Sequence, residues 1–384
     1  MAPTNREQLA KHSSQGAFVI WHGMNVSSLC RFLAMRPPLS VSRFGRLALL
    51  PGMAMYNSAM GLAENLVYGR AVEQTEIKQP PIFILGYWRS GTTLLHNLFT
   101  RDPRFTFPNL YQTFFPWHFL LTERLMTTLT AGLVPESRPM DNVKCAWDLP
   151  QEDDVALCIM SLVSPYLLTA WSGDFSVYTP TFDFKGLPEK DVQRWKDALM
   201  LLVKKVTYRT PKPLILKSPS HTYRIPMLLE MFPGAKFVYI SRNPYNVFNS
   251  TLHLRKTMIE ENTLGKVNYD GHEEEVIRTF RHGFECYERD RHLIPEGDLH
   301  ELRFEDLEQD PIGEMEQCYD TLGLGEFDTL RSILEPELPQ LRRYRKNKFR
   351  PDTKWMERVY NELRSTFDRF GYPSPLDEVE TAAA

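Results

Sequence analysis

Residues 81–100 read PIFILGYWRSGTTLLHNLFT, and the rest of the chain is organised around this stretch. The apolar run at its start predicts a short buried strand that ends at Gly86. Thr92 begins an apolar pattern typical of a helix. A strand, a glycine-bounded turn and a helix N-terminus form a natural anion site, because backbone N–H groups and the helix dipole both favour negative charge there.

The turn differs from that of a nucleoside triphosphatase. The spacing of Gly86 and Gly91 matches a P-loop, but Thr92 occupies the position where such an enzyme has its lysine. The cation is Arg89, inside the turn. We therefore predict a loop that binds a phosphate group without the usual lysine and Mg²⁺ arrangement, and we expect no metal site.

The five residues Arg89, Ser90, Gly91, Thr92 and Thr93 resemble the 5′-phosphosulfate-binding loop of sulfotransferases that use 3′-phosphoadenosine 5′-phosphosulfate (PAPS). The resemblance is to the bacterial-type branch of this P-loop-like family and extends over about residues 81–350. It implies that these five residues bind the sulfuryl donor. Taken alone, the motif also fits a tight strand–helix turn that binds nothing.

Later segments predict an α/β fold. Short apolar runs at 213–216 and 236–240 each predict a strand, a further strand is predicted at 299–304, and helical patterns separate them. Strands that alternate with helices favour a central parallel sheet with right-handed crossovers, flanked by helices. This is the P-loop-type sulfotransferase fold that the resemblance implies.

A second phosphate site is predicted at the carboxyl end of the strand at 236–240. Arg242 lies two residues beyond this strand, and Ser250 comes eight residues later, about two helical turns on. A guanidinium and a hydroxyl group at the carboxyl end of a strand can bind a phosphate. The same order in sulfotransferases implies that this pair binds the 3′-phosphate of PAPS.

The C-terminal part contains a basic run, RRYRKNKFR, at residues 342–350. It resembles the loop that covers the nucleotide in the family, which would assign nucleotide contacts to Arg345 and Lys346. The alternative is a solvated basic face. Three positions depart from relatives: Arg89 stands where many have lysine, Leu94 where cytosolic relatives have a tryptophan that stacks on adenine, and Phe304 where a tyrosine is common. The adenine contacts are therefore left open.

Sulfuryl transfer requires groups that stabilise developing negative charge and a base that takes a proton from the acceptor. Arg89 suits the first task, and Lys217, at a neighbouring strand end, can stabilise the leaving group. Two residues remain candidates for the base. His221 resembles the histidine of cytosolic relatives, although Pro219 alters its spacing. Glu152 is the alternative, and it fits equally a helix start with acidic residues in its first turn.

The first 80 residues differ in charge from the rest. They contain eight Lys/Arg and four Glu, interleaved with aromatic and aliphatic residues. We predict a helical N-terminal arm at 1–80 and a sulfotransferase domain at 81–384. The arm either packs on its own domain or on a second subunit, or lies on an anionic membrane surface.

Composition narrows the function further. The net charge is −3, so nothing global points to nucleic acid, and five scattered cysteines without a C-x-x-C pair favour a cytoplasmic setting. We predict transfer of a sulfuryl group from PAPS to a hydroxyl group, or less readily an amine, of an apolar, lipid-like or glycan-like acceptor. The alternatives are a nucleotide or small-molecule kinase and a silent nucleotide-binding scaffold. An assay with ATP and Mg²⁺ would distinguish a kinase from a sulfotransferase.

Overall fold

The computed structural model describes residues 19–135, 144–341 and 352–376. The chain forms two compact units, each assembled from separate segments. Unit 1 comprises Met1–Glu76, Pro108–Arg209 and His253–Gly271, and unit 2 comprises Ile77–Phe107, Thr210–Leu252 and His272–Ala384. Arg345 and Lys346 lie outside the described residues. The division into an arm at 1–80 and a domain at 81–384 stays a prediction.

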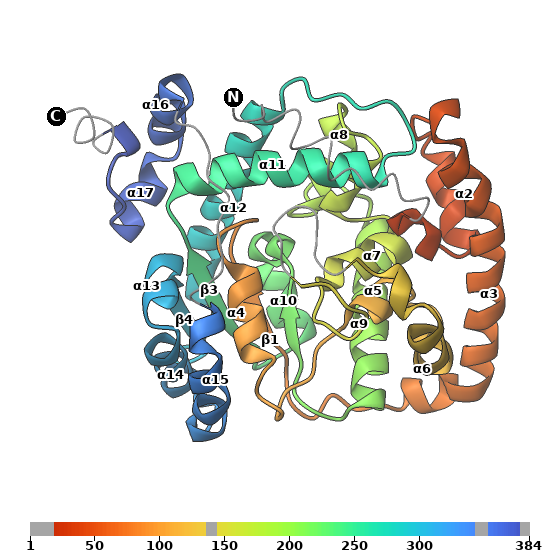
Figure 1. The fold of residues 1–384 in the computed structure, drawn as a ribbon, viewed down its shortest axis with the longest axis horizontal. Helices are drawn as coiled ribbons and strands as arrows, with labels where there is room; N and C mark the ends of the chain where they lie inside the picture. Colours follow the sequence, from red (N-terminus) through yellow and green to blue (C-terminus); the bar gives the residue numbers. More distant parts are fainter. Residues whose placement is uncertain (1–18, 136–143, 342–351, 377–384) are drawn as a thin grey trace. The chain divides into compact units, whose positions relative to one another are not determined.

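Unit 2 contains the sheet, which is parallel throughout. Its strands are β1 (Ile82–Leu85), β2 (Ile215–Lys217), β3 (Lys236–Ser241) and β4 (Leu299–Arg303), in the order β2-β1-β3-β4 (Figure 1). Each of the four predicted strands is present. β1 lies between β2 and β3 and is buried along its whole length, which explains why it reads as an unbroken apolar run.

Helices cover both faces of the sheet. Ile82 and Ile84 point to one face, where they join a core cluster with α4 (Thr92–Phe99), α14 (Pro311–Leu322) and α15 (Asp328–Leu341). Phe83 points to the other face, where its ring meets Phe232 and Phe237 beside α10 (Ile225–Met231). On that face Tyr239 also stacks on Tyr287 of α12 (His272–Asp290) at 3.7 Å between ring centroids. The predicted α/β fold is confirmed.

The other helices of unit 2 continue from the sheet. The chain leaves β3 into α11 (Pro244–Asn262), which runs on into unit 1. After α12 come η7 (Arg291–Leu293), β4 and α13 (Phe304–Gln309), and the described chain ends with α16 (Thr353–Glu362) and α17 (Arg364–Phe370). Pro311 separates α13 from α14 (Pro311–Leu322), because proline has no backbone N–H to donate within a helix; α14 begins after its N-cap Asp310.

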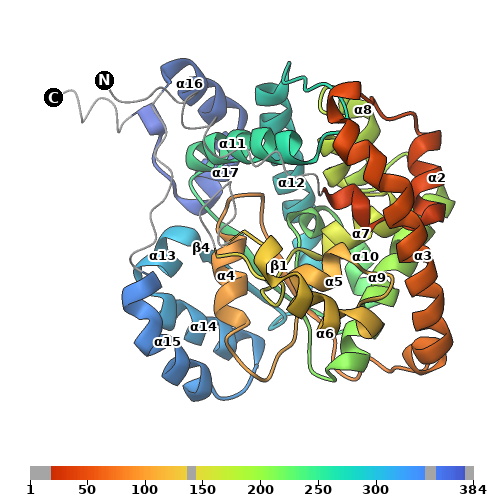
Figure 2. The ribbon, with the colours of Figure 1, turned by 45° about the vertical axis from the view of Figure 1, so that its right-hand side comes forward.

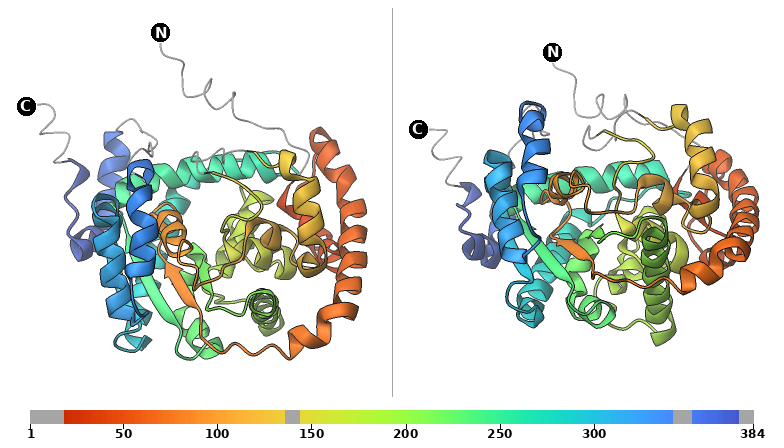
Figure 3. Two further views of the ribbon diagram at one scale, coloured as in Figure 1. Left: turned by 60° about the horizontal axis from the view of Figure 1, so that its bottom comes forward. Right: turned by 90° about the horizontal axis from the view of Figure 1, so that it is seen from below.

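Unit 1 is helical in its described residues. Its elements are η1 (Ile20–Gly23), α2 (Val26–Ala34), η2 (Val41–Arg43), α3 (Phe44–Glu73), α5 (Leu110–Phe114), α6 (Phe119–Leu129), η3 (Ala131–Leu133), α7 (Asp153–Ser161), η4 (Pro165–Thr169), α8 (Phe175–Tyr178), η5 (Thr179–Thr181) and α9 (Glu189–Arg209). The 30-residue α3 packs beside α2, α6 and α9, as Figures 2 and 3 show.

A buried ion pair joins α3 to α9. Glu64 Oε1 lies 2.5 Å from Lys205 Nζ, and both side chains are about 95% buried. Lys205 also donates to the carbonyl of Pro116, so the pair has further hydrogen-bonding partners. Among the described residues, no helix is both long enough and apolar enough to cross a membrane.

Candidate active site

The turn between β1 and α4 has a backbone that few residues adopt. Gly86 and Gly91 have φ of +139° and +104°, and Arg89 has φ of +71° although it is not glycine. A left-handed conformation costs a non-glycine residue about 1–2 kcal/mol. Strain of this kind is commonest at binding sites, and the side-chain contacts of Arg89 give a reason for it.

Thr222 fixes the start of the turn. This residue lies in the short 3₁₀ helix η6 (Pro219–Tyr223), directly after β2. The N–H of Gly86 donates to its Oγ1 at 2.9 Å, and Thr222 Oγ1 donates back to the carbonyl of Gly86 at 3.1 Å. Within the turn, Ser90 Oγ donates to the carbonyl of Tyr87 at 2.8 Å. The turn is therefore held in place from η6 and from within.

Gly91 is the N-cap of α4, and it has no room for a side chain. A Cβ added there would lie 2.3 Å from Cδ2 of Phe304 and 3.2 Å from Ile240. Phe304, which follows β4, thus packs its ring directly against the helix N-terminus. The first N–H groups of α4 have no acceptor within the helix, so they can donate to an anion.

The two cations predicted from separate motifs meet at the ends of β1 and β3. Arg242 donates from Nη1 to the carbonyl of Arg89 at 3.1 Å, and Arg89 donates from Nε to Ser250 Oγ at 2.8 Å. The guanidinium of Arg242 also lies over the ring of Phe304, 4.3 Å from its centroid. Thr251 donates to the carbonyl of Trp88 at 3.1 Å, which ties α11 to the turn.

Lys217 lies next to this cluster. It is the last residue of β2, and its Cα pairs with that of Ile84, two residues before Gly86. Its side chain is buried within the protein, with 2% of the residue exposed. The parallel register thus brings the end of β2 beside the turn, as the clustering of strand ends requires.

The two candidate bases lie in different units. His221 belongs to unit 2, where it is fully buried in η6 with its ring edge against Phe83, 5.3 Å between centroids. Glu152 belongs to unit 1, where it is the N-cap residue of α7 and is 9% exposed. Its carboxylate accepts a hydrogen bond from the hydroxyl group of Tyr166. Its carboxylate makes no N-cap hydrogen bond to the helix. Either role remains a prediction.

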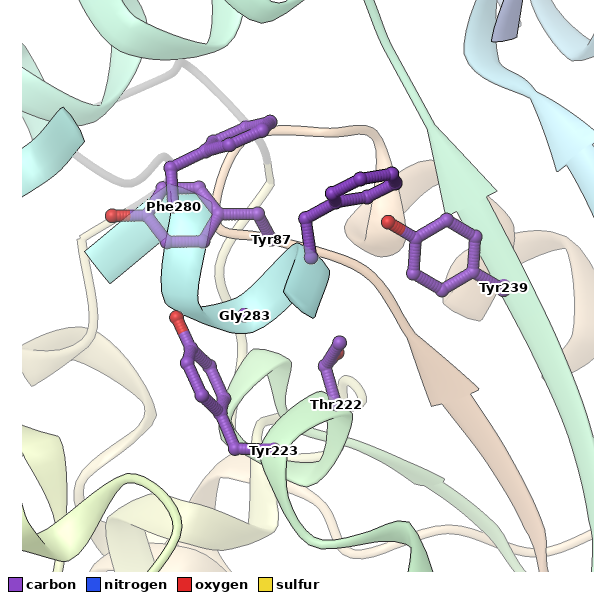
Figure 4. Close-up of a pocket in the computed structure, with 7 residues that line it drawn as sticks. Tyr87, Thr222, Tyr223, Tyr239, Phe280 and Gly283 are labelled. Carbon is purple, nitrogen blue, oxygen red and sulfur yellow. The ribbon is translucent and has the colours of Figure 1, made fainter. Parts of the chain in front are cut away.

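Aromatic residues connect the turn and η6 to α12. The hydroxyl groups of Tyr87 and Thr279 are hydrogen-bonded to each other at 2.8 Å. The Tyr223 hydroxyl group donates to the carbonyl of Thr279 at 2.7 Å. Figure 4 shows Tyr87, Tyr223 and Tyr239 around a cavity only large enough for a water molecule. Burial raises the pKa of the Tyr239 phenol, so this hydroxyl stays protonated. The back of the turn is therefore packed and rigid.

Sequence reasoning missed Thr222, Thr251 and Phe304 as parts of this site. Thr222 directly follows His221, and Thr251 directly follows Ser250, but no motif marks either threonine. Phe304 is distinguished in the sequence only as a position where relatives commonly have tyrosine. Gly91, which Phe304 contacts, is a sequence signal for this packing, because a glycine at a helix N-cap can indicate that another side chain approaches the backbone closely.

The geometry of this cluster can accommodate an anion. Two guanidinium groups, a hydroxyl group and a helix N-terminus converge on the carboxyl ends of β1 and β3. Charge-assisted hydrogen bonds of this kind are about twice as strong as neutral ones. The arrangement suits a ligand that carries more than one phosphate or sulfate group.

Comparison with known proteins agrees with this chemistry. Residues 80–328 match the model of the sulfotransferase family. The omega-hydroxy-beta-dihydromenaquinone-9 sulfotransferase Stf3 of Mycobacterium bovis is 37% identical over 354 residues, which cover 92% of this chain and 91% of that protein. The chain belongs to the sulfotransferase family. The Mycobacterium tuberculosis form of the same enzyme matches this sulfotransferase equally well.

Solved structures share the fold of this sulfotransferase at much lower identity. Sulfotransferase STF9 from Mycobacterium avium superposes with a TM-score of 0.66 at 17% identity, over 95% of this chain and 96% of that one. Sulfotransferase STF1 from Mycobacterium tuberculosis superposes with a TM-score of 0.57 at 18% identity, over 94% of this chain and 98% of that one. The predictions of family and fold are confirmed.

Proposed function

We propose that this sulfotransferase moves a sulfuryl group from PAPS to the hydroxyl group of an apolar, lipid-like acceptor. Family membership supports the reaction, and the relative at 37% identity is named for a hydroxylated menaquinone derivative. The observation that carries the proposal for the donor is the hydrogen-bonded chain from Arg242 through Arg89 to Ser250. It joins the two predicted phosphate sites in one cluster.

The hydrogen-bond donors of this cluster suit PAPS, which carries a 5′-phosphosulfate and a 3′-phosphate. In our proposal the turn from Arg89 to Thr93 and the N-terminus of α4 bind the phosphosulfate. Arg242 and Ser250 bind the 3′-phosphate. Because Arg89 Nε donates to Ser250 Oγ, the hydroxyl hydrogen of Ser250 is directed to another acceptor, which a phosphate oxygen supplies. Arg345 and Lys346 are proposed to cover the nucleotide.

The chemical step exchanges one sulfur–oxygen bond for another. The acceptor oxygen attacks sulfur, the bond from sulfur to the bridging phosphate oxygen breaks, and that oxygen leaves with the bond's electrons. Lys217 and Arg89 stabilise the charge that develops on the leaving oxygen. A base, His221 or Glu152, takes the acceptor proton. No residue of this scheme requires a metal ion, so we expect activity in the presence of a chelator.

Product analysis tests the proposal. The full chain is incubated in EDTA with sulfur-labelled PAPS and four acceptors, namely an omega-hydroxylated isoprenoid quinol, a long-chain alcohol, a phenol and a monosaccharide. We expect label in the hydroxylated lipid and none with an Arg89→Ala variant. A parallel reaction with ATP and Mg²⁺ should leave every acceptor unmodified. Phosphorylated product in that reaction, or label only in the monosaccharide, would contradict the proposal.

A further inference from the structure

Helix α3 of unit 1 is apolar on two faces. Its buried residues, Arg46, Leu50, Ala54, Asn57, Glu64 and Val72, lie on the side that packs on the unit. A second row at helical spacing faces solvent and consists of Phe44, Ala48, Pro51, Met55, Ala59, Leu62 and Leu66, which we call the outer stripe. A surface helix of a globular protein normally carries polar residues on that side.

The outer stripe is strongly exposed. Phe44 is 69% exposed, Met55 66%, Leu62 67% and Leu66 87%. Glu64, the single charged residue between Arg46 and Arg70, is turned inward to Lys205. Over these residues, a length of about 35 Å at 1.5 Å per residue, no charge solvates the stripe. An uncharged apolar surface of this extent indicates an interaction site.

Arginines lie before and after the outer stripe. Arg36 and Arg43 precede it, and Arg70 follows it with Glu73 three residues further on, so the positive charge is greatest at the N-terminal end. Leu39 and Val41, which are 49% and 86% exposed, extend the apolar surface between the first two arginines. An apolar strip next to arginines suits a membrane interface, where the strip can enter the acyl boundary while the arginines reach the headgroup phosphates.

The charges bear on what covers the stripe. If two α3 helices paired in parallel, Arg36 and Arg43 would each face the same residue of the other copy, which opposes like charges. In an antiparallel pair centred on Met55, Arg36 would lie near Glu73 of the other copy, an arrangement that sedimentation equilibrium tests below. An anionic lipid surface attracts Arg36 and Arg43 and buries the stripe at the same time.

We propose that the outer stripe of α3 docks this sulfotransferase on anionic membrane, with the helix lying in the interface plane. Leu62 and Leu66 enter the boundary between headgroups and acyl chains, and Arg36, Arg43 and Arg70 contact lipid phosphates. The proposal concerns a surface of unit 1 and is independent of the proposed donor and acceptor.

Vesicle flotation tests the docking surface. The full chain is mixed with vesicles of equal parts phosphatidylglycerol and phosphatidylcholine, or of phosphatidylcholine alone, without nucleotide or quinol. We expect the parent to float with the anionic vesicles and to be released by salt. The Leu62→Glu/Leu66→Glu variant should partition at least about a hundredfold less, since burial of one leucine is worth roughly a tenfold factor or more. Arg36→Gln/Arg43→Gln should lose about fivefold per arginine.

Two controls make the result specific. Leu293→Glu changes a leucine that is 47% exposed in η7 of unit 2, and it should float like the parent. Circular dichroism checks that each variant is folded, and Met55→Gln/Ala59→Gln repeats the test with milder changes. Equal flotation of parent and stripe variants, or no flotation of the parent, would overturn the proposal. Sedimentation equilibrium that finds a parental dimer and a monomeric Leu62→Glu/Leu66→Glu variant, without vesicle binding, would assign the stripe to a second copy instead.

Discussion

The contact between Gly91 and Phe304 allows the contribution of packing at the turn to stability and turnover to be measured. In Gly91→Ala, the backbone conformation at φ of +104° alone costs about 1–2 kcal/mol. The new methyl group lies 2.3 Å from Cδ2 of Phe304, so the ring must move, and overpacking of this kind costs about 1–3 kcal/mol more. We expect a loss of about 3 kcal/mol in the free energy of unfolding, measured by urea denaturation. Because Arg242 lies over the same ring, turnover should fall about a hundredfold.

Gly323→Ala is the matched control. Gly323 has φ of +59°, and an added Cβ would meet no atom within 4 Å. This variant should lose only the backbone cost, about 1–2 kcal/mol, and keep full activity. In a double-mutant cycle, Gly91→Ala combined with Phe304→Ala should cost less than the sum of the two single changes. Equal stability of Gly91→Ala and Gly323→Ala, together with parental turnover in both, would refute the packing argument.

Further predictions concern the base and the effect of pH. His221→Ala should lower turnover about 10²- to 10⁴-fold while affinity for the desulfated donor barely changes; if that variant stays active and Glu152→Gln does not, the carboxylate is the base. Burial, with the charge of Lys205 nearby, lowers the pKa of His118 from 6.5 to about 4. The unfolded chain therefore takes up a proton that the folded protein does not, and the free energy of unfolding should fall by about 3 kcal/mol as pH drops from 6.5 to 4. His118→Gln should remove this dependence in pH-resolved denaturation, and a change at the exposed His292 to Gln should keep it.

β1, β2 and β3 were predictable because each is a short apolar run buried on both faces, whereas β4 alternates between buried and partly exposed residues. The turn was predictable as an anion site because its glycines and its position before a helix are local features. The left-handed conformation of Arg89 was not predictable, since no local pattern requires it. It is explained by the bond to Ser250, which is 161 residues away in sequence.

Long-range packing accounts for the remaining differences. The contact of Phe304 with Gly91 depends on β3 lying between β1 and β4, and this strand order does not follow from the apolar runs alone. The position of His221 against Phe83 depends on the same sheet. The outer stripe of α3 lies within the N-terminal arm that the sequence predicts to be helical. Only the structure shows that the stripe faces solvent while other residues of the helix form the packed side.

Titration calorimetry of the desulfated donor, 3′-phosphoadenosine 5′-phosphate, tests the central claim most directly. The parent should bind it in EDTA. Arg242→Ala should weaken binding by about 2–3 kcal/mol, roughly 30- to 150-fold, and Ser250→Ala by about 1 kcal/mol. Arg331→Ala, which removes an arginine paired with Glu316, controls for net charge and should bind like the parent. Parental affinity in Arg242→Ala, or no binding by the parent, would contradict a donor site built on Arg89, Arg242 and Ser250.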